Sequence, residues 1–211
     1  MTTLAQIEAA IAPFGLIQMG GVALDAPARS LILIGAGPDF WPVFTASPEY
    51  ADGAPDPVDR WSTRVLGTLA QEFAAEATFP FGGPPYQPFL QWALDSGQSY
   101  QSPVGMLVHV RAGMMISFRG ALILPGRIAL PAPAPSPCPP CARPCADACP
   151  VGALREGAPY DVAACKAHIA SPEGADCLQN GCLVRRACPV SQEFDRDPAQ
   201  SALHMAAFLK G

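Results

Sequence analysis

The stretch CPPCARPCADACPVGA, residues 138–153, holds four cysteines within twelve residues, and proline follows the last of them. All eight cysteines of the 211-residue chain lie between Cys138 and Cys188. Just before the first comes LPAPAPSP, residues 130–137, whose alternating proline and alanine favour an extended connector over a helix or central strand. The sequence therefore predicts an N-terminal domain over residues 1–129, a linker over 130–137 and a cysteine domain over 138–211.

Bulk composition narrows the class of protein. Half of the residues are apolar and 15% are charged, which is enough apolar material for a core and argues against disorder. The formal net charge is −5, and no basic block of the kind that binds nucleic acid occurs. The first residues do not resemble a signal peptide, and no apolar run reaches 18 residues. We expect a cytoplasmic protein with neither a nucleic-acid nor a membrane partner.

The spacing of the first cysteine run favours an iron–sulfur site. Eight cysteines in a reducing compartment are not expected to form disulfides, and structural zinc sites usually present two C-x2-C pairs. This chain has one such pair, Cys138 and Cys141, and then continues as C-x2-C-x3-C-x3-C-P with Cys145 and Cys149. In double-cluster proteins three thiolates of such a run hold one cluster, and the cysteine before proline serves the other. A zinc-stabilised binding module and plain structural thiols are the alternatives.

The second cysteine group completes the ligand count. Cys165 is followed by Cys177, Cys182 and Cys188, and Pro189 comes directly after the last. Four and four cysteines are enough for two [4Fe–4S] clusters. Crossed pairing assigns Cys138, Cys141, Cys145 and Cys188 to one cluster, and Cys149, Cys165, Cys177 and Cys182 to the other. In the alternative, uncrossed pairing, each run keeps its own proline-linked cysteine.

Residues 138–190 resemble the double-cluster module of epoxyqueuosine reductases and corrinoid reductive dehalogenases. The resemblance lies in the order of a four-cysteine run ending CPVGA, a lone cysteine in YDVAACKAHIAS, and a three-cysteine group ending in CP. The whole chain is also similar to short alphaproteobacterial ferredoxin-like proteins, through the phrases DPVDRWSTRV, GGPPYQPFLQWA, RGALILP and GCLVRRACPV. The resemblance implies an electron-transfer protein with two [4Fe–4S] clusters and an unidentified redox partner protein.

The N-terminal domain reads as alternating helices and strands. Apolar spacing predicts a helix over 4–14 ended by Gly15, strands over 16–24 and 30–35, and a long helix over 56–77. A second helix is expected over 87–97, and two paired strands over 105–110 and 114–124. A terminal helix should start at Asp197. The expected fold class is α+β: a layered α/β domain with a central mixed sheet, then a small bacterial-ferredoxin-like domain.

The order FGLIQMGG followed by SLILIG is similar to the opening of the reductase family. That family and the cobalamin-trafficking chaperones share a fold related to flavin nitroreductases. The resemblance implies that residues 1–129 hold a corrinoid or a flavin, which makes a corrinoid- or flavin-dependent oxidoreductase the alternative function. The candidate cofactor-binding residues are Arg60, Arg64, Tyr86 and Arg119. The alternative for the two helical arginines is bridging to Asp56 and Glu72, and His109 reads as a core histidine rather than a cofactor contact.

Overall fold

The chain passes three times between two structural units in the computed structural model, which describes residues 2–25 and 27–211. The first unit comprises residues 1–98 and 117–134, and the second comprises residues 99–116 and 135–211. The third passage, between Ala134 and Pro135, falls inside the expected linker. The first passage differs from the predicted boundaries, because residues 99–116 belong with the cysteine region instead of with the domain expected over 1–129.

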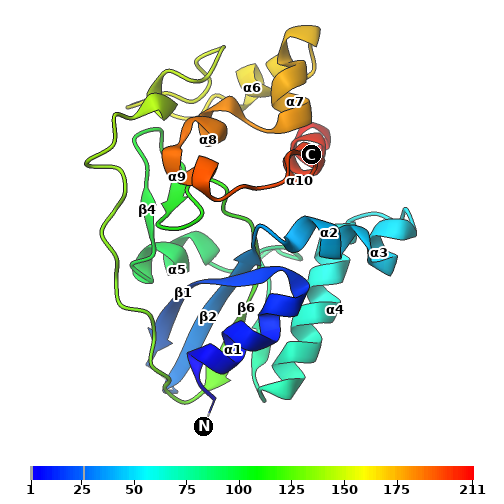
Figure 1. The fold of residues 1–211 in the computed structure, drawn as a ribbon, viewed down its shortest axis with the longest axis vertical. Coiled ribbons are helices and arrows are strands. Elements are labelled where there is room, and N and C mark those ends of the chain that lie inside the picture. The colour runs from blue at the N-terminus through cyan, green and yellow to red at the C-terminus, as the bar shows by residue number, and fades with distance from the viewer. Residues whose placement is uncertain (1, 26) are drawn as a thin grey trace. The chain divides into compact units, whose positions relative to one another are not determined.

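The first unit is built on an antiparallel sheet (Figure 1). Its strand order is β1 (Leu16–Leu24), β2 (Arg29–Ala36), β6 (Phe118–Pro125) and β3 (Glu76–Thr78), and every neighbouring pair is antiparallel. The expectation of an α+β fold is confirmed, but the expectation of a mixed sheet is wrong. A parallel pair needs a long crossover between its strands, whereas β1 turns back directly into β2.

The prediction that 30–35 forms a central strand is confirmed. β2 lies between β1 and β6, and the side chains of Leu31, Ile32, Leu33 and Ile34 are fully buried. Burying each of these side chains contributes on the order of 1.5–3 kcal/mol. β1 carries a bulge between Gln18 and Gly21, which explains how a strand with two adjacent glycines still pairs along its length.

Helices accompany this sheet. α1 (Leu4–Ile11) is followed by a short 3-10 helix (Ala12–Phe14), which ends at Gly15 with a left-handed φ of 64°, as predicted. α4 (Pro57–Glu72) contacts β6 and β3, while α1 and α5 contact β1 (Figure 1). Trp61 of α4 is buried edge-on against Phe40, with ring centroids 5.2 Å apart. The remaining helices of this unit are α2 (Phe40–Thr45), α3 (Pro48–Ala51) and α5 (Phe89–Asp95).

The long helix is shorter than predicted. α4 ends at Glu72, and Ala74 takes a left-handed φ of 49° that closes the last turn. The N–H of Ala75 donates to the carbonyl of Ala70 at 2.8 Å, a bond that reaches back over the helix end. The chain then enters β3, where Thr78 pairs with β6. The alanines in this stretch favour a helix, so the sequence pattern did not reveal the short edge strand.

The second unit holds the cysteines and has little sheet. β4 (Ser99–Gln101) and β5 (Leu107–His109) form a two-stranded hairpin. This corrects the expected pairing of 105–110 with 114–124, because β6 pairs with β2 and β3 instead. The helices of this unit are the 3-10 turns Pro144–Ala146 and Pro172–Gly174, α6 (Val162–Ile169), α7 (Ala175–Asn180), α8 (Leu183–Ala187), α9 (Pro189–Glu193) and α10 (Pro198–Lys210). The terminal helix begins as predicted, because the Asp197 carboxylate caps it.

Long-range hydrogen bonds explain why residues 99–116 belong to the second unit. The N–H of Met114 donates to the Ser191 hydroxyl at 2.8 Å. The Arg185 guanidinium donates to the Met114 carbonyl at 2.6 Å. The side chain of Met114 is buried together with Val108 and with Cys145 and Cys188. The hairpin segment therefore forms part of the core that surrounds the cysteines.

His109 is a core histidine, as the sequence analysis predicts. Its side chain is 1% exposed, and Nδ1 accepts the N–H groups of Arg111 and Ala112 at 3.1 and 3.2 Å. Burial, helped by the positive charge of Arg111, lowers the pKa of His109 from 6.5 to about 4. The side chain is thus neutral in the folded protein at physiological pH.

A pH dependence of stability follows from this histidine. Between pH 6.5 and about 4 the unfolded chain binds a proton at His109 that the folded protein does not. The free energy of unfolding should therefore fall as the pH drops below 6.5, by up to about 3 kcal/mol near pH 4. Urea titrations from pH 5 to 8 should reveal this slope. It should flatten in His109→Asn, and an equal slope in both proteins would exclude His109 as its source.

Candidate metal centres

Four cysteines line a cavity of about 250 Å³ in the second unit: Cys138, Cys141, Cys145 and Cys188. The rest of its wall is mostly apolar and includes Val108, Met114 and several prolines. Cys145 and Cys188 are buried, whereas the other two are partly exposed. The cavity is thus a sulfur-lined hollow in an apolar setting, and we call it the first site.

Local turns bring three of these cysteines together. The N–H of Cys141 donates to the carbonyl of Cys138 at 3.1 Å, which closes a turn between them. Arg143 adopts a left-handed φ of 58°, and the 3-10 turn Pro144–Ala146 then presents Cys145. Cys188 arrives from far along the chain, at the junction of α8 and α9, where Pro189 starts a new helix. The proline therefore ends one helix and redirects the chain at the ligand position.

The other four cysteines line a second cavity, here called the second site: Cys149, Cys165, Cys177 and Cys182. Cys165 lies on α6, Cys177 lies on α7, and Cys182 immediately precedes α8. This cavity is narrower, about 20 Å³, which is space for roughly one water molecule. Its four thiols are a suitable donor set for a cluster, but a space of this size does not hold one.

The two cavities divide the cysteines in the same way as crossed pairing. Cys149 belongs to the first run but lines the cavity of the second group, and Cys188 does the reverse. The interactions between thiols follow the same division. In addition to burial, the thiols of Cys188 and Cys138 raise the pKa of Cys145, and those of Cys182 and Cys149 raise the pKa of Cys165. Both proline-linked cysteines are therefore exchanged between the runs.

Burial and neighbouring sulfurs disfavour free thiolates at both sites. Burial raises the pKa of Cys138, Cys145, Cys165 and Cys177, and nearby thiols of the same cavity raise it further. Four thiols packed in this way ionise together only when a cation compensates their charge. A metal centre supplies that charge and deprotonates its ligands.

Backbone N–H groups point at two of the sulfurs. The N–H of Arg143 donates to Cys141 Sγ at 3.3 Å, and the N–H of Ala153 donates to Cys149 Sγ at 3.2 Å. Donors of this kind stabilise negative charge on ligand sulfurs and tune bound clusters. Each site has at least one such donor.

A single metal ion and a four-iron cluster need different arrangements of four cysteine ligands. Within the described residues, no group of three or more His, Cys, Asp or Glu side chains forms a site for one ion. Four ligands of one zinc ion all stand about 2.3 Å from it. Each iron of a four-iron cluster takes one cysteine, so the four ligands surround a larger body. The first cavity, of about 250 Å³, has room for such a body, whereas the second, of about 20 Å³, does not in this structure.

The arginines expected to bind a cofactor lie in ion pairs with a neighbouring helix. Arg60 donates to both carboxylate oxygens of Asp52, at 2.7 and 2.8 Å. Arg64 donates to both carboxylate oxygens of Glu49, at 2.5 and 2.9 Å, and these bonds lower the pKa of the Glu49 carboxyl. α4 is thereby tied to α3. Both arginines therefore bridge to carboxylates, as the alternative predicted, but the partners are Asp52 and Glu49 instead of Asp56 and Glu72.

Arg119 and Tyr86 lie in different surroundings. Burial lowers the pKa of Arg119 to about 10, and its guanidinium stands 3.8 Å from Asp59 of α4. Tyr86 is 66% exposed. The structure therefore brings the three arginines to one helix, two of them as residues of α4 and the third beside it. Neither cysteine cavity is lined by any of the four candidates.

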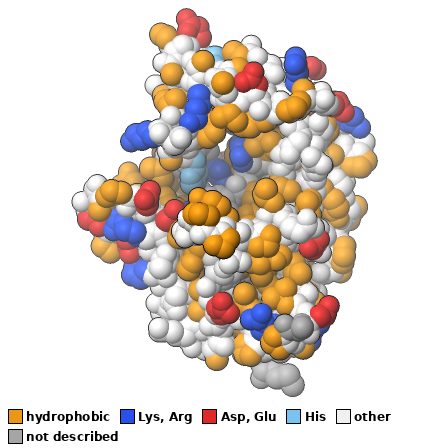
Figure 2. Space-filling model, turned by 180° about the vertical axis from the view of Figure 1, so that it is seen from behind, with side chains coloured by type: hydrophobic (Ala, Val, Ile, Leu, Met, Phe, Trp, Pro, Cys, Tyr) orange, Lys and Arg blue, Asp and Glu red, His pale blue; other side chains and the backbone are white. Residues whose placement is uncertain are grey.

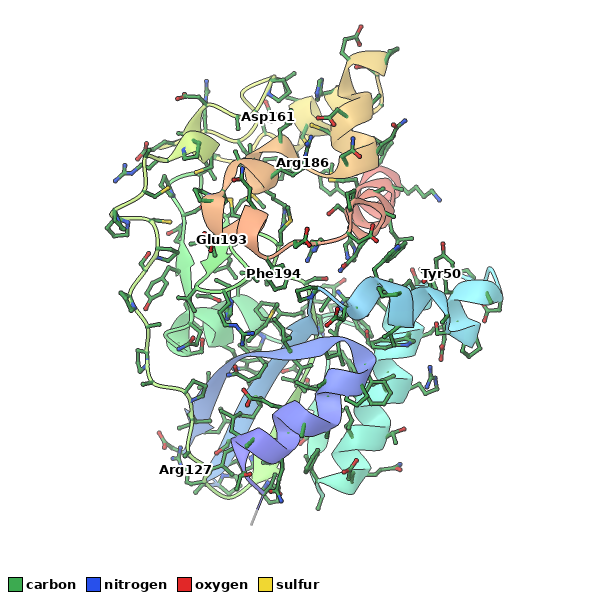
Figure 3. The ribbon with its side chains drawn as sticks, viewed as in Figure 1. Tyr50, Arg127, Asp161, Arg186, Glu193 and Phe194 are labelled. Carbon is green, nitrogen blue, oxygen red and sulfur yellow. The ribbon has the colours of Figure 1, made fainter. Side chains whose placement is uncertain are left out.

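Tyr160 gave no comparable signal in the sequence, whereas Arg185 and Arg186 lie beside the second cysteine run, where the sequence predicts that they tune a cluster potential or face solvent. The Tyr160 ring stacks on Phe208 of α10 with centroids 6.4 Å apart, and the Arg185 guanidinium donates to the Met114 carbonyl at 2.6 Å. The only cue for Tyr160 is its place directly before Asp161, which caps α6 (Figure 3). On the adjacent helix α8, Arg186 pairs instead with Asp176 of α7 (Figure 3). The two consecutive arginines thus have different surroundings.

The surface gives no single charge pattern on the face drawn in Figure 2, where basic and acidic side chains are mixed among apolar ones. None of the helices in the described part of the chain has the length and apolar character needed to cross a membrane. Comparison of the chain with protein-family models, with curated proteins and with solved structures gave no match.

Proposed function

We propose that this protein transfers electrons by means of two [4Fe–4S] clusters, bound in a ferredoxin-like double-cluster module formed by the second unit. The supporting observation is the division of eight cysteines into two cavities of four, with the two proline-linked cysteines exchanged. The same exchange is typical of two-cluster ferredoxins. The redox partners of this protein are separate proteins.

The residues of each site have distinct tasks. Four thiolates hold each cluster, and a bound cluster supplies reversible one-electron storage. The N–H groups of Arg143 and Ala153 donate to ligand sulfurs and compensate their negative charge. Around the first site, Val108 and Met114 limit the access of water, which also influences the reduction potential.

The alternative function, a corrinoid- or flavin-dependent oxidoreductase, stays a prediction from the resemblance. It requires a cofactor at Arg60, Arg64, Tyr86 or Arg119, and two of these side chains already bind carboxylates. Titration of the protein with cobalamin and with flavin nucleotides, followed by absorbance, is its direct test. The zinc-module alternative is tested by the metal analysis below.

Metal analysis tests the proposed function. Protein purified without oxygen, or reconstituted with iron and sulfide, should contain about eight iron and about eight acid-labile sulfide per chain, as two cubanes require. Loss of clusters in air makes anaerobic handling essential. Stoichiometric zinc without sulfide in the anaerobic sample would refute the proposal.

A further inference from the structure

Several chain segments line the second cavity, and among those of the described residues only α10 carries no cysteine. One loop carries Cys149, while α6, α7 and the start of α8 carry Cys165, Cys177 and Cys182. The remaining segment is α10, which contributes Met205 to the wall. α10 can therefore move away from this cavity without removing a ligand.

α10 lies against the segments that present these cysteines. It packs on α7 (Figure 1). At Gly181, which joins α7 to α8, a Cβ atom would lie 2.7 Å from the Cβ of Ser201, so the backbone there touches α10 directly. On the other side, the Nζ atom of Lys166 in α6 lies 5.4 Å from the centre of the Phe208 ring. α10 thus spans the helices that surround the second site.

The position of α10 bears on the size of the second cavity. This cavity measures about 20 Å³, whereas the first measures about 250 Å³ and has room for a cluster. The α10 side chain in its wall is Met205, and methionine is unbranched and adapts readily to a change in its surroundings. An outward movement of α10 would enlarge the cavity and leave all four thiols in place.

One buried side chain opposes the packed position of α10. Gln200, in the first turn of the helix, is 1% exposed. Its Oε1 and Nε2 atoms are among the buried polar atoms of the described residues that have no hydrogen-bond partner. An amide that is buried without partners loses its hydrogen bonds to water and gains none in return. Burial of this amide lowers the free energy needed to displace α10.

We propose that α10 is a movable cover of the second site, and that iron and sulfide reach or leave this site only when α10 has moved outward. The inference rests on the proposed function, because it needs a cluster at each site. The first cavity already has room for a cluster, so exchange there needs no such movement. The first site should therefore exchange its cluster with the surroundings faster than the second.

The test is the loss of clusters from fully loaded, anaerobic protein in excess ethylenediaminetetraacetate, followed by the iron–sulfur absorbance. The wild type should lose its clusters in two phases of equal size, and the slow phase should belong to the second site. Met205→Ala weakens the closed position and should speed the slow phase about tenfold, because the rate follows the population of the open position. Gln200→Leu removes the unpaired amide and should slow this phase.

The fast phase is the internal reference, and both α10 variants should leave its rate unchanged. Lys210→Ala, at an exposed position of the same helix, should change neither phase. Cys141→Ala/Cys188→Ala, which keeps only the second site, should show the slow phase alone. Cys165→Ala/Cys177→Ala, which keeps only the first site, should show the fast phase alone.

The outcomes distinguish two kinds of failure. A protein that binds no iron and sulfide would end the proposed function itself. Three results with loaded protein would overturn only the inference: a single phase, a slow phase that neither Met205→Ala nor Gln200→Leu changes, or both phases accelerated equally by Met205→Ala, which marks a general loss of stability. The α10 variants in the wild-type background decide the question even if the double cysteine variants bind no iron.

Discussion

Cys141→Ala/Cys188→Ala should lose about half of the iron and sulfide, whereas Cys141→Ala/Cys149→Ala should lose nearly all of it. In the first variant both substitutions fall in the first site, so the second site keeps its four ligands. In the second variant each site loses one ligand. Both variants remove two cysteines, so they differ only in how the losses are shared between the sites.

Uncrossed pairing makes the opposite prediction. If each run kept its own proline-linked cysteine, Cys141 and Cys149 would share a cluster, and their joint loss would spare the other. Iron and sulfide analysis of the two anaerobically prepared variants, matched by protein concentration, therefore decides the ligand sets. Alanine is preferable to serine here because a serine hydroxyl can replace a thiolate as a ligand.

Removing the clusters should unfold most of the second unit and leave the first unit folded. The helices α6 to α9 are five to eight residues long, too short to be stable alone in water. Cys145 and Cys188 are part of the buried core with Val108 and Met114. Metal binding should therefore supply much of the free energy of folding, as it does in other small metal-binding domains.

Hydrogen–deuterium exchange should resolve this effect by segment. Without clusters, or in Cys141→Ser or Cys182→Ser, amide protection over 138–190 should fall by about tenfold or more. The β4–β5 hairpin should lose protection with it, although it ends about thirty residues before the first cysteine. β2 of the first unit is the internal control and should remain protected. Unchanged protection of 138–190 after cluster removal would refute the coupling.

The sequence pattern predicted those helices and strands whose formation depends on local interactions. The apolar run of β2, Pro57 at the start of α4, Gly15 after α1 and Asp197 before α10 all predicted their elements. Each signal depends on a residue's own backbone preference or on one apolar stripe. Strand partners are different, because they depend on residues far apart in the chain. That is why the pairing predicted for 105–124 was wrong.

Unit boundaries show the same limit. The linker at 130–137 was visible because proline-rich composition is a local property. The passage at Gln98 and Ser99 carries no such mark, since it depends on hydrogen bonds such as that from Met114 to Ser191, 77 residues away. A sequence without aligned relatives cannot reveal contacts of that range.

The candidate site shows the same difference between residues that the sequence identifies and residues that depend on long-range packing. Cysteine spacing identified all eight cysteines that line the two cavities, because residue type and order are written directly in the chain. Tyr160 was not identified, because its stacking on Phe208 of α10 joins residues far apart in the chain. Arg60 and Arg64 stood out in sequence, and the structure places both in ion pairs.

The most direct test of the central claim is a crystal structure of the anaerobically prepared protein, with anomalous diffraction measured on both sides of the iron absorption edge. The account predicts two iron-specific density peaks, each large enough for four atoms. One should contact Cys138, Cys141, Cys145 and Cys188, and the other Cys149, Cys165, Cys177 and Cys182. A single-ion peak that persists below the iron edge, or a cluster held by the four cysteines of one run, would contradict it.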